Sequence, residues 1–176
     1  MGSNRYCKCH FFEGESEHWG LLDRKAFAHK GASPHYTPDI EVSPEHLILE
    51  VNFYWVKERV WGKTQYNLLV KGHDVEEITL DAVNLEVSRV LIERKSVNFE
   101  NTGRKIIIPL NKKYQLGDRI SIKLDHSVTR PVAGIYFTKP DNHHTDRFKT
   151  VWTQGQDEDS RYYFPCFDKP NFKQTT

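Results

Sequence analysis

Apolar and polar residues alternate with a period of two along most of the chain after residue 45. In residues 47–54 every odd-numbered position is apolar, whereas Glu50 and Asn52 stand at even-numbered positions. This is the pattern of a strand with one buried face. Runs rich in β-forming residues are predicted at 46–53, 65–70, 78–82, 85–92, 97–99, 105–109, 119–124, 134–137 and 148–153. Since no window keeps a helical apolar period for about three turns, we expect helix only as a short turn near residues 157–161.

Turn-forming residues separate these runs. Gly72, Gly103 and Gly117 fall between them, and the stretch from Asn101 to Gly103 is typical of a hairpin loop. About nine strands at spacings of roughly 8–12 residues indicate an all-β fold, either an antiparallel β-sandwich or a saddle-shaped sheet domain with little helix.

The beginning of the chain differs from the rest, because it is polar and has no sustained apolar period. We therefore predict an irregular N-terminal extension over residues 1–40 and one β-domain over residues 41–176.

Cysteine and histidine residues near the N-terminus raise the question of a metal site. Cys7, Cys9, His10 and His18 are of the types that bind zinc. Structural zinc sites prefer about two to four residues between paired cysteines, and only one separates Cys7 from Cys9. A polar terminus is favoured over a small zinc site, so we assign no metal ligand in this chain.

Composition narrows the setting in which the protein works. With 25 basic and 24 acidic side chains, its formal charge of +1 offers no attraction to nucleic acid or to an anionic membrane. No apolar run approaches the roughly 18 residues of a membrane span, and the first ten residues lack the apolar core of a signal peptide. Three cysteines make an odd count that does not fit a disulfide framework. We therefore expect a reducing, cytoplasmic setting, with neither nucleic acid nor membrane as a partner.

The densest pattern in the chain lies at residues 151–173. Gln154 and Gln156 stand one residue apart at the end of a β-type run, and an acidic turn follows. A block of aromatic residues around Pro165 and Cys166 comes next. The segment resembles the T-Q-x-[EQ]-x-x-x-x-R-x-x-F-P-C-x-D-x-P signature of the aminopeptidase N family of zinc metallopeptidases, to which the leukotriene-hydrolase branch belongs.

The order of the strands also resembles the N-terminal domain of that family. Residues 46–53, 79–87 and 134–137 are similar to its opening strand, its Asp-Ala element and its Gly-[IL]-Tyr run. The resemblance covers residues 40–176 and implies a β-domain that walls the active-site cleft of a zinc aminopeptidase. It also implies that the intact protein hydrolyses N-terminal residues from peptides. Its partners would be a peptide N-terminus and the catalytic domain of the same protein.

In that family the catalytic domain holds zinc on an H-E-x-x-H helix, where two His share one face. These 176 residues contain no H-E-x-x-H. We therefore expect no cofactor in this chain, zinc in a catalytic domain outside it, no catalytic residue within it and no activity from it alone. An excised domain would leave an exposed sheet edge and an apolar patch, through which we expect self-association.

The two glutamines are the predicted substrate-binding residues. On an extended segment, Gln154 and Gln156 would share one face. Their amide oxygens can accept hydrogen bonds from an ammonium group, and their NH2 groups can donate to a peptide carbonyl. The resemblance implies that Gln156 helps to hold the peptide N-terminus and that Gln154 lines the first side-chain subsite. Many relatives carry Glu at position 156, and a neutral amide lacks the charge-assisted part of that contact. Without the resemblance, the pair would be the polar face of an edge strand.

Four further residues of the signature are predicted to be structural. Arg161 and Asp168 are candidates for a partly buried ion pair that shapes the loop. Cys166, which follows Pro165, is expected to be a buried and unreactive thiol. The acidic run before Arg161 could cap a short helical turn.

Aromatic residues at strand positions offer a separate possibility. Trp55 and Trp61 could form a stacking platform for a carbohydrate or a base. Aromatic residues at this spacing are more often core residues or cross-strand pairs, and we favour that interpretation.

A second hypothesis for the whole chain is a non-catalytic β-sandwich interaction module that keeps the scaffold without catalysis. Whether the reading frame continues past Thr176 into H-E-x-x-H distinguishes the two hypotheses.

Overall fold

The computed structural model describes residues 40–176. The predicted extension, apart from Ile40, lies outside the described residues, as do its cysteine and histidine residues. Within the described part, antiparallel strands and two short 3-10 turns confirm the all-β prediction. The strands are β1 (Val42–Tyr54), β2 (Arg59–Val70), β3 (Val75–Asp81), β4 (Glu86–Ile92), β5 (Lys95–Val97), β6 (Glu100–Asn101), β7 (Lys105–Tyr114), β8 (Arg119–Thr129), β9 (Ile135–Thr138) and β10 (Thr150–Thr153), and the 3-10 turns are η2 (Trp55–Lys57) and η3 (Ser160–Tyr162).

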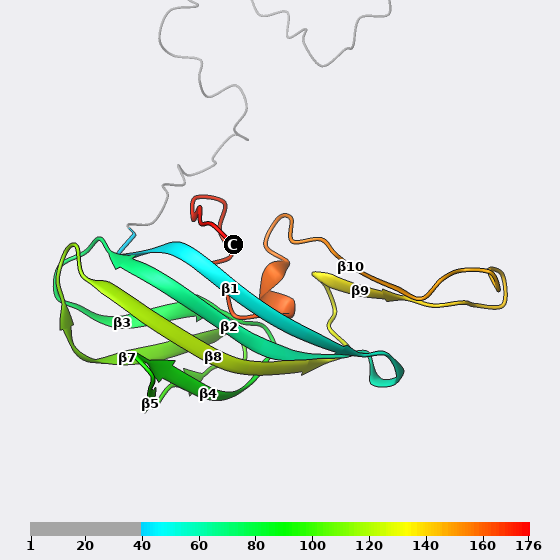
Figure 1. The fold of residues 1–176 in the computed structure, drawn as a ribbon, viewed down its shortest axis with the longest axis horizontal. Helices are drawn as coiled ribbons and strands as arrows, with labels where there is room; N and C mark the ends of the chain where they lie inside the picture. Colours follow the sequence, from blue (N-terminus) through cyan, green and yellow to red (C-terminus); the bar gives the residue numbers. More distant parts are fainter. Residues whose placement is uncertain (1–39) are drawn as a thin grey trace, which may run out of the picture. The chain divides into compact units, whose positions relative to one another are not determined.

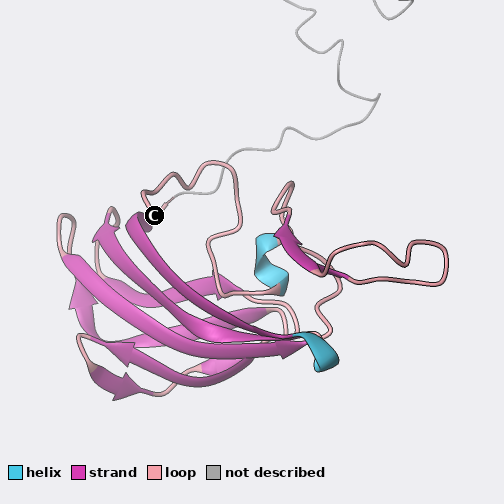
Figure 2. Ribbon diagram, turned by 45° about the vertical axis from the view of Figure 1, so that its right-hand side comes forward, coloured by secondary structure: helices cyan, strands magenta, loops and turns pink. Residues whose placement is uncertain are grey.

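Two sheets form the β-domain, and a two-stranded hairpin extends from it (Figure 1). The larger sheet has the order β1-β2-β8-β4-β5, the smaller one has the order β3-β7-β6, and β9 pairs with β10. Figure 2 shows the small sheet stacked against one face of the large sheet. The predicted sandwich is therefore present, with unequal layers.

The core lies between the two sheets because strands of both turn their apolar positions inward. On β2 and β8, alternate residues are buried, and β3 and β7 contribute the facing layer. The largest fully buried side chains are Tyr66, Leu68, Ile78, Leu80, Ile106, Ile108, Ile120, Ile122, Leu124 and Ile135. Their burial is the main favourable contribution to folding.

The structure corrects two predicted elements. No single strand spans the expected residues 97–99, because Val97 ends β5, residues 98 and 99 lie in no strand, and β6 begins at Glu100. Strand β5 pairs with β4, whereas β6 pairs with β7. The hairpin loop between β6 and β7 is present, and there the backbone N–H of Gly103 donates to Asn101 Oδ1 at 2.9 Å. The helical turn expected at residues 157–161 is instead η3, and its N-cap residue Asp159 makes no capping hydrogen bond with its side chain.

The edge strand β1 pairs with β2 on one side. On its other side it forms a short bridge with the C-terminal end of the described chain. The N–H of Leu47 donates to the carbonyl of Thr175 at 2.8 Å, and the N–H of Thr175 donates to the carbonyl of Glu45 at 3.1 Å. Beyond this bridge, the rest of the β1 edge has no ladder partner among residues 40–176. An open edge of this kind can pair with another strand, and self-association through it stays a prediction.

No helix within residues 40–176 has the length and hydropathy needed to cross a membrane.

One polar pair interrupts the apolar core. Thr64 on β2 and His126 on β8 point inward, and Thr64 Oγ1 lies 2.9 Å from His126 Nε2. Both side chains are buried. Burial lowers the pKa of His126 from 6.5 to about 4, although the neighbouring charge of Asp125 acts in the opposite direction. The imidazole is therefore neutral at physiological pH.

We expect His126→Gln to make the stability of the chain less dependent on pH. The pKa of His126 is about 4 in the folded chain against 6.5 as its ordinary value, so the unfolded chain binds the proton first as the pH falls. The free energy of unfolding therefore has its full value above about pH 6.5. It falls as the pH decreases from about 6.5 to about 4, by roughly 3 kcal/mol in total. Urea unfolding at a series of pH values measures this difference.

The control is His143→Gln, a substitution in the exposed loop that follows β9. It should leave the pH dependence as in the wild type. Parallel stability curves for the wild type and His126→Gln would contradict the prediction.

Candidate functional site

The segment that carries the predicted site follows β10 and returns toward the large sheet through η3 (Figure 1). Strand β10 ends at Thr153, although the N–H of Gln154 still donates to the carbonyl of Gly134 at 3.0 Å. The chain then turns, and the N–H of Asp159 donates to the carbonyl of Gly155 at 3.1 Å. Gln156 lies inside that turn, so the predicted extended segment with both glutamines on one strand face is wrong. Both glutamine side chains are exposed.

A glycine allows this loop to pack closely against the start of β9. Gly134 has a φ of +78°, and a Cβ at this position would lie 2.0 Å from the carbonyl oxygen of Asp159. A larger residue would therefore clash with the backbone of the loop and would also be strained. This contact fixes the loop that carries the two glutamines.

Arg161 and Asp168 form the ion pair expected from the sequence. Arg161 Nε lies 2.9 Å from Asp168 Oδ2, and the backbone N–H of Arg161 donates to the same oxygen at 3.1 Å. Arg161 Nη2 also donates to the backbone carbonyl of Asp168 at 3.1 Å, and it pairs with Glu158. The Arg161 and Asp168 side chains are 19% and 8% exposed, so solvent screens this pair weakly.

Backbone pairing attaches the same segment to the small sheet. The N–H of Asp81 donates to the carbonyl of Cys166 at 2.8 Å, and the N–H of Cys166 donates back at 3.0 Å. The hydroxyl of the buried Tyr66 donates to the carbonyl of Pro165 at 3.2 Å. Burial, followed by the charges of Asp168 and Asp81, raises the pKa of the Cys166 thiol well above its usual value. The thiol is therefore protonated at physiological pH.

This arrangement can present two neutral amide groups from a loop with a fixed backbone. An exposed amide can accept a hydrogen bond from an ammonium group and donate one to a carbonyl. Residues 40–176 contain no group of three His, Cys, Asp or Glu side chains that could hold a metal ion. The resemblance implies zinc in the catalytic domain and not on these residues, so we place no metal-dependent step on them.

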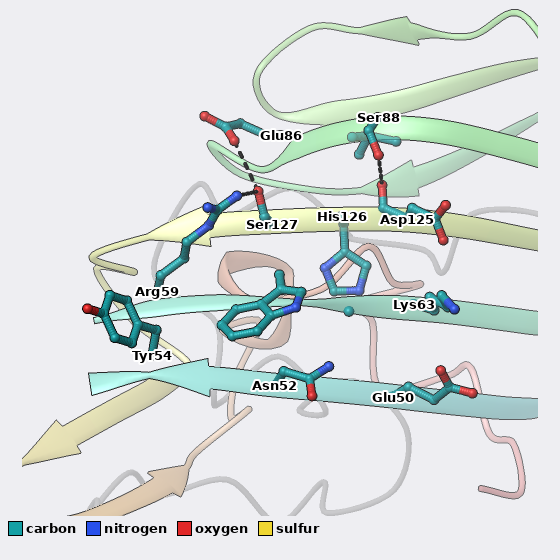
Figure 3. A pocket seen from close by; sticks show the side chains of 13 residues that line it. Glu50, Asn52, Tyr54, Arg59, Lys63, Glu86, Ser88, Asp125, His126 and Ser127 are labelled. Carbon is teal, nitrogen blue, oxygen red and sulfur yellow. Dashed lines mark hydrogen bonds between the residues drawn. The ribbon is translucent and has the colours of Figure 1, made fainter. Parts of the chain in front are cut away.

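A second candidate site, which the strand pattern alone does not reveal, lies on the outer face of the large sheet (Figure 3). We call it the outer-face hollow, and its volume is about 720 Å³. It is lined by Glu50, Asn52, Tyr54, Arg59, Trp61, Gly62, Lys63, Glu86, Val87, Ser88, Asp125, His126 and Ser127.

The sequence contained one signal for this hollow, the run of polar residues at alternate positions of β1 and β2. The sequence predicts a core or cross-strand position for Trp61, and the structure rules out the core position, because Trp61 is 40% exposed and lies opposite Asn52 of β1. Trp55 does pack against an aromatic neighbour, since its ring centroid lies 5.3 Å from that of Phe137.

Comparison with known proteins identifies a family. The family model described as the peptidase M1 N-terminal domain matches residues 33–176. Probable aminopeptidase 1 of Sulfurisphaera tokodaii is 31% identical over 102 residues, which cover 57% of this chain and 12% of that protein. Leucine aminopeptidase 2 of Candida glabrata is 26% identical over 137 residues, which cover 74% of this chain and 21% of that protein. The chain thus spans a small part of the length of both relatives.

Solved structures show the same fold. Leukotriene A4 hydrolase from Saccharomyces cerevisiae superposes with a TM-score of 0.65 at 19% identity, covering 88% of this chain and 26% of that chain. The M1 zinc metallopeptidase from Deinococcus radiodurans superposes with a TM-score of 0.61 at 16% identity, covering 77% of this chain and 31% of that chain.

We expect Asp168→Ala to destabilise the chain by about 3 kcal/mol, because it leaves the Arg161 guanidinium partly buried without its main partner. Glu158→Ala removes the other, half-exposed carboxylate of the same arginine and should cost less than about 1 kcal/mol. Equilibrium unfolding in urea measures both changes. Equal effects of the two substitutions would show that burial of the Asp168 pair does not matter to stability.

Proposed function

The chain belongs to the peptidase M1 N-terminal domain family, and from this membership we propose that it walls the active-site cleft of a zinc aminopeptidase. In the intact enzyme Gln154 and Gln156 would bind the free N-terminus of a peptide. The enzyme would then remove N-terminal residues from that peptide. The match over residues 33–176 and the relatives that are themselves aminopeptidases support this proposal.

The observation that carries the proposal is the contrast between the two glutamine side chains and their backbone. Both side chains are exposed, so they are free to meet a ligand. The loop that holds them is fixed at Gly134 before them and by Arg161 and Cys166 after them. A binding group is most effective when its position is set before the ligand arrives, because less entropy is lost on binding.

The chemistry of the pair sets a limit on its role. Gln154 and Gln156 are neutral, so they can orient an ammonium group by hydrogen bonds but cannot neutralise its charge. We propose that a carboxylate of the catalytic domain supplies that charge, and that the zinc ion and its ligands also belong to that domain.

Aromatic residues on β1, η2 and the β9–β10 hairpin are proposed to face the catalytic domain. The rings of Trp55 and Phe137 are in contact, and those of Tyr136 and Trp152 are stacked with centroids 4.3 Å apart. Trp152 is 50% exposed and Val56, on η2, is 82% exposed. Exposed apolar groups of this kind mark surfaces that another domain covers. The buried free thiol of Cys166 is compatible with the reducing, cytoplasmic setting that we propose.

A chimera tests the role of the glutamines. Residues 40–176 would replace the matching segment of Leucine aminopeptidase 2 from Candida glabrata, and hydrolysis of leucine p-nitroanilide would be followed. We expect Gln156→Ala to raise KM roughly tenfold with a smaller change in kcat, because a hydrogen bond to a charged ammonium group is lost.

The matched control is Gln115→Ala, since Gln115 is also exposed but lies in the turn between β7 and β8. It should leave both constants unchanged. An active chimera in which Gln156→Ala has the same KM as the unsubstituted form would overturn the proposed role.

A further inference from the structure

The outer-face hollow is formed by four neighbouring strands of the large sheet. Strands β1, β2, β4 and β8 contribute its walls and floor, and most of the lining side chains lie on the face opposite the core, whereas the buried His126 borders the hollow from the inward face (Figure 3). Its volume of about 720 Å³ falls in the range of small-molecule and oligosaccharide sites. The glutamine loop contributes none of the lining residues, so the hollow is separate from the site proposed above.

Hydrogen bonds between strands hold part of the lining in place. Arg59 Nη2 donates to Ser127 Oγ at 3.2 Å, and Ser127 Oγ donates to Glu86 Oε2 at 3.0 Å. On the other side, Arg89 pairs with one carboxylate oxygen of Asp125. The second oxygen, Asp125 Oδ1, is buried and has no hydrogen-bond partner among residues 40–176.

Other lining groups are free to bind. Glu50 and Lys63 are directly opposite each other on β1 and β2, as are Asn52 and Trp61. None of these four side chains makes a hydrogen bond or ion pair with another residue in the described part of the chain. Together they offer donors and acceptors around the indole ring of Trp61, a residue that is 40% exposed.

The charge of the lining selects the class of ligand. Three carboxylates, those of Glu50, Glu86 and Asp125, face two cations, Arg59 and Lys63. This near balance gives no attraction to a polyanion such as nucleic acid, and a lipid would leave the polar groups unpaired. A neutral ligand with many hydroxyl groups can instead use donors and acceptors together and place one apolar face on the indole ring.

The shape of the same face favours a chain over a single unit. A second hollow of about 540 Å³ lies farther along β2 and β8. Gln65, which lines it, is two residues after Lys63 on β2, and its cross-strand partner Lys123 is two residues before Asp125 on β8. The second hollow presents the same mixture of amide, hydroxyl and charged groups. We propose that the outer-face hollow binds an oligosaccharide, with Trp61 as its stacking platform and Asn52 and Lys63 as hydrogen-bonding partners.

The test is isothermal titration calorimetry of the full chain with three soluble sugars, maltohexaose, cellohexaose and the hexamer of N-acetylglucosamine. We expect saturable binding of at least one of them, with Trp61→Ala weakening it on the order of tenfold through loss of the aromatic contact. Lys63→Ala, which removes an exposed side chain together with its ammonium group, should also weaken binding. It keeps the test valid if Trp61→Ala does not fold.

The matched control is Trp152→Ala, since Trp152 is also exposed but lies on the β9–β10 hairpin. It should bind as the wild type does. Absence of binding to all three sugars, or an equal loss in Trp61→Ala and Trp152→Ala, would overturn the proposal. Binding of a mixed Lys-Glu peptide, and not of the sugars, in a manner sensitive to Trp61→Ala would also overturn it and would assign the hollow to a peptide.

Discussion

The antiparallel bridge between Asp81 and Cys166 is the constraint on which the other features of the functional segment depend. Its two backbone hydrogen bonds attach the returning chain to the end of β3, far away in sequence. Such a long closure has an entropic cost, and one bridge alone does not offset it. The Arg161–Asp168 pair and the hydroxyl of Tyr66 stabilise the same attachment from both sides. The Gln154–Gln156 loop is fixed because the segment that follows it is fixed.

The strands could be predicted from the sequence because a period of two records which face of a strand is buried. This worked best for β1, β2 and β8, where buried and exposed residues alternate for many positions. It failed at residues 97–99, because runs of two or three residues are too short to show which sheet they join. It failed again at Gln156, where a turn closed by Gly155 and Asp159 depends on contacts that no periodicity describes.

The candidate sites likewise differ in how far the sequence alone could predict them. The Arg161–Asp168 pair could be expected from a short motif, because both partners lie within one loop. The outer-face hollow could not, since the consecutive strands β1 and β2 contribute only part of its lining and the rest comes from β4 and β8, which are farther along the chain. Alternation indicated that Glu50, Asn52 and Lys63 would point outward, but only the strand order brings them beside Asp125 of β8. Local sequence therefore indicates the side on which a residue lies, and topology determines its neighbours.

The alternation of buried and exposed residues gives the large sheet two faces, and polar side chains have a different energetic cost on each. Inward positions are mostly apolar, and the inward imidazole of His126 on β8 has one partner, Thr64, whose Oγ1 lies 2.9 Å from its Nε2. Outward positions can remain polar and unpaired because water satisfies them, and such groups are available to a ligand without the loss of any internal bond. A substitution at Trp61 or Lys63 can therefore change the outer surface with little effect on the core. The same freedom does not extend to the glutamine loop, where Gly134, Arg161 and Cys166 connect the exposed side chains directly to the folded interior.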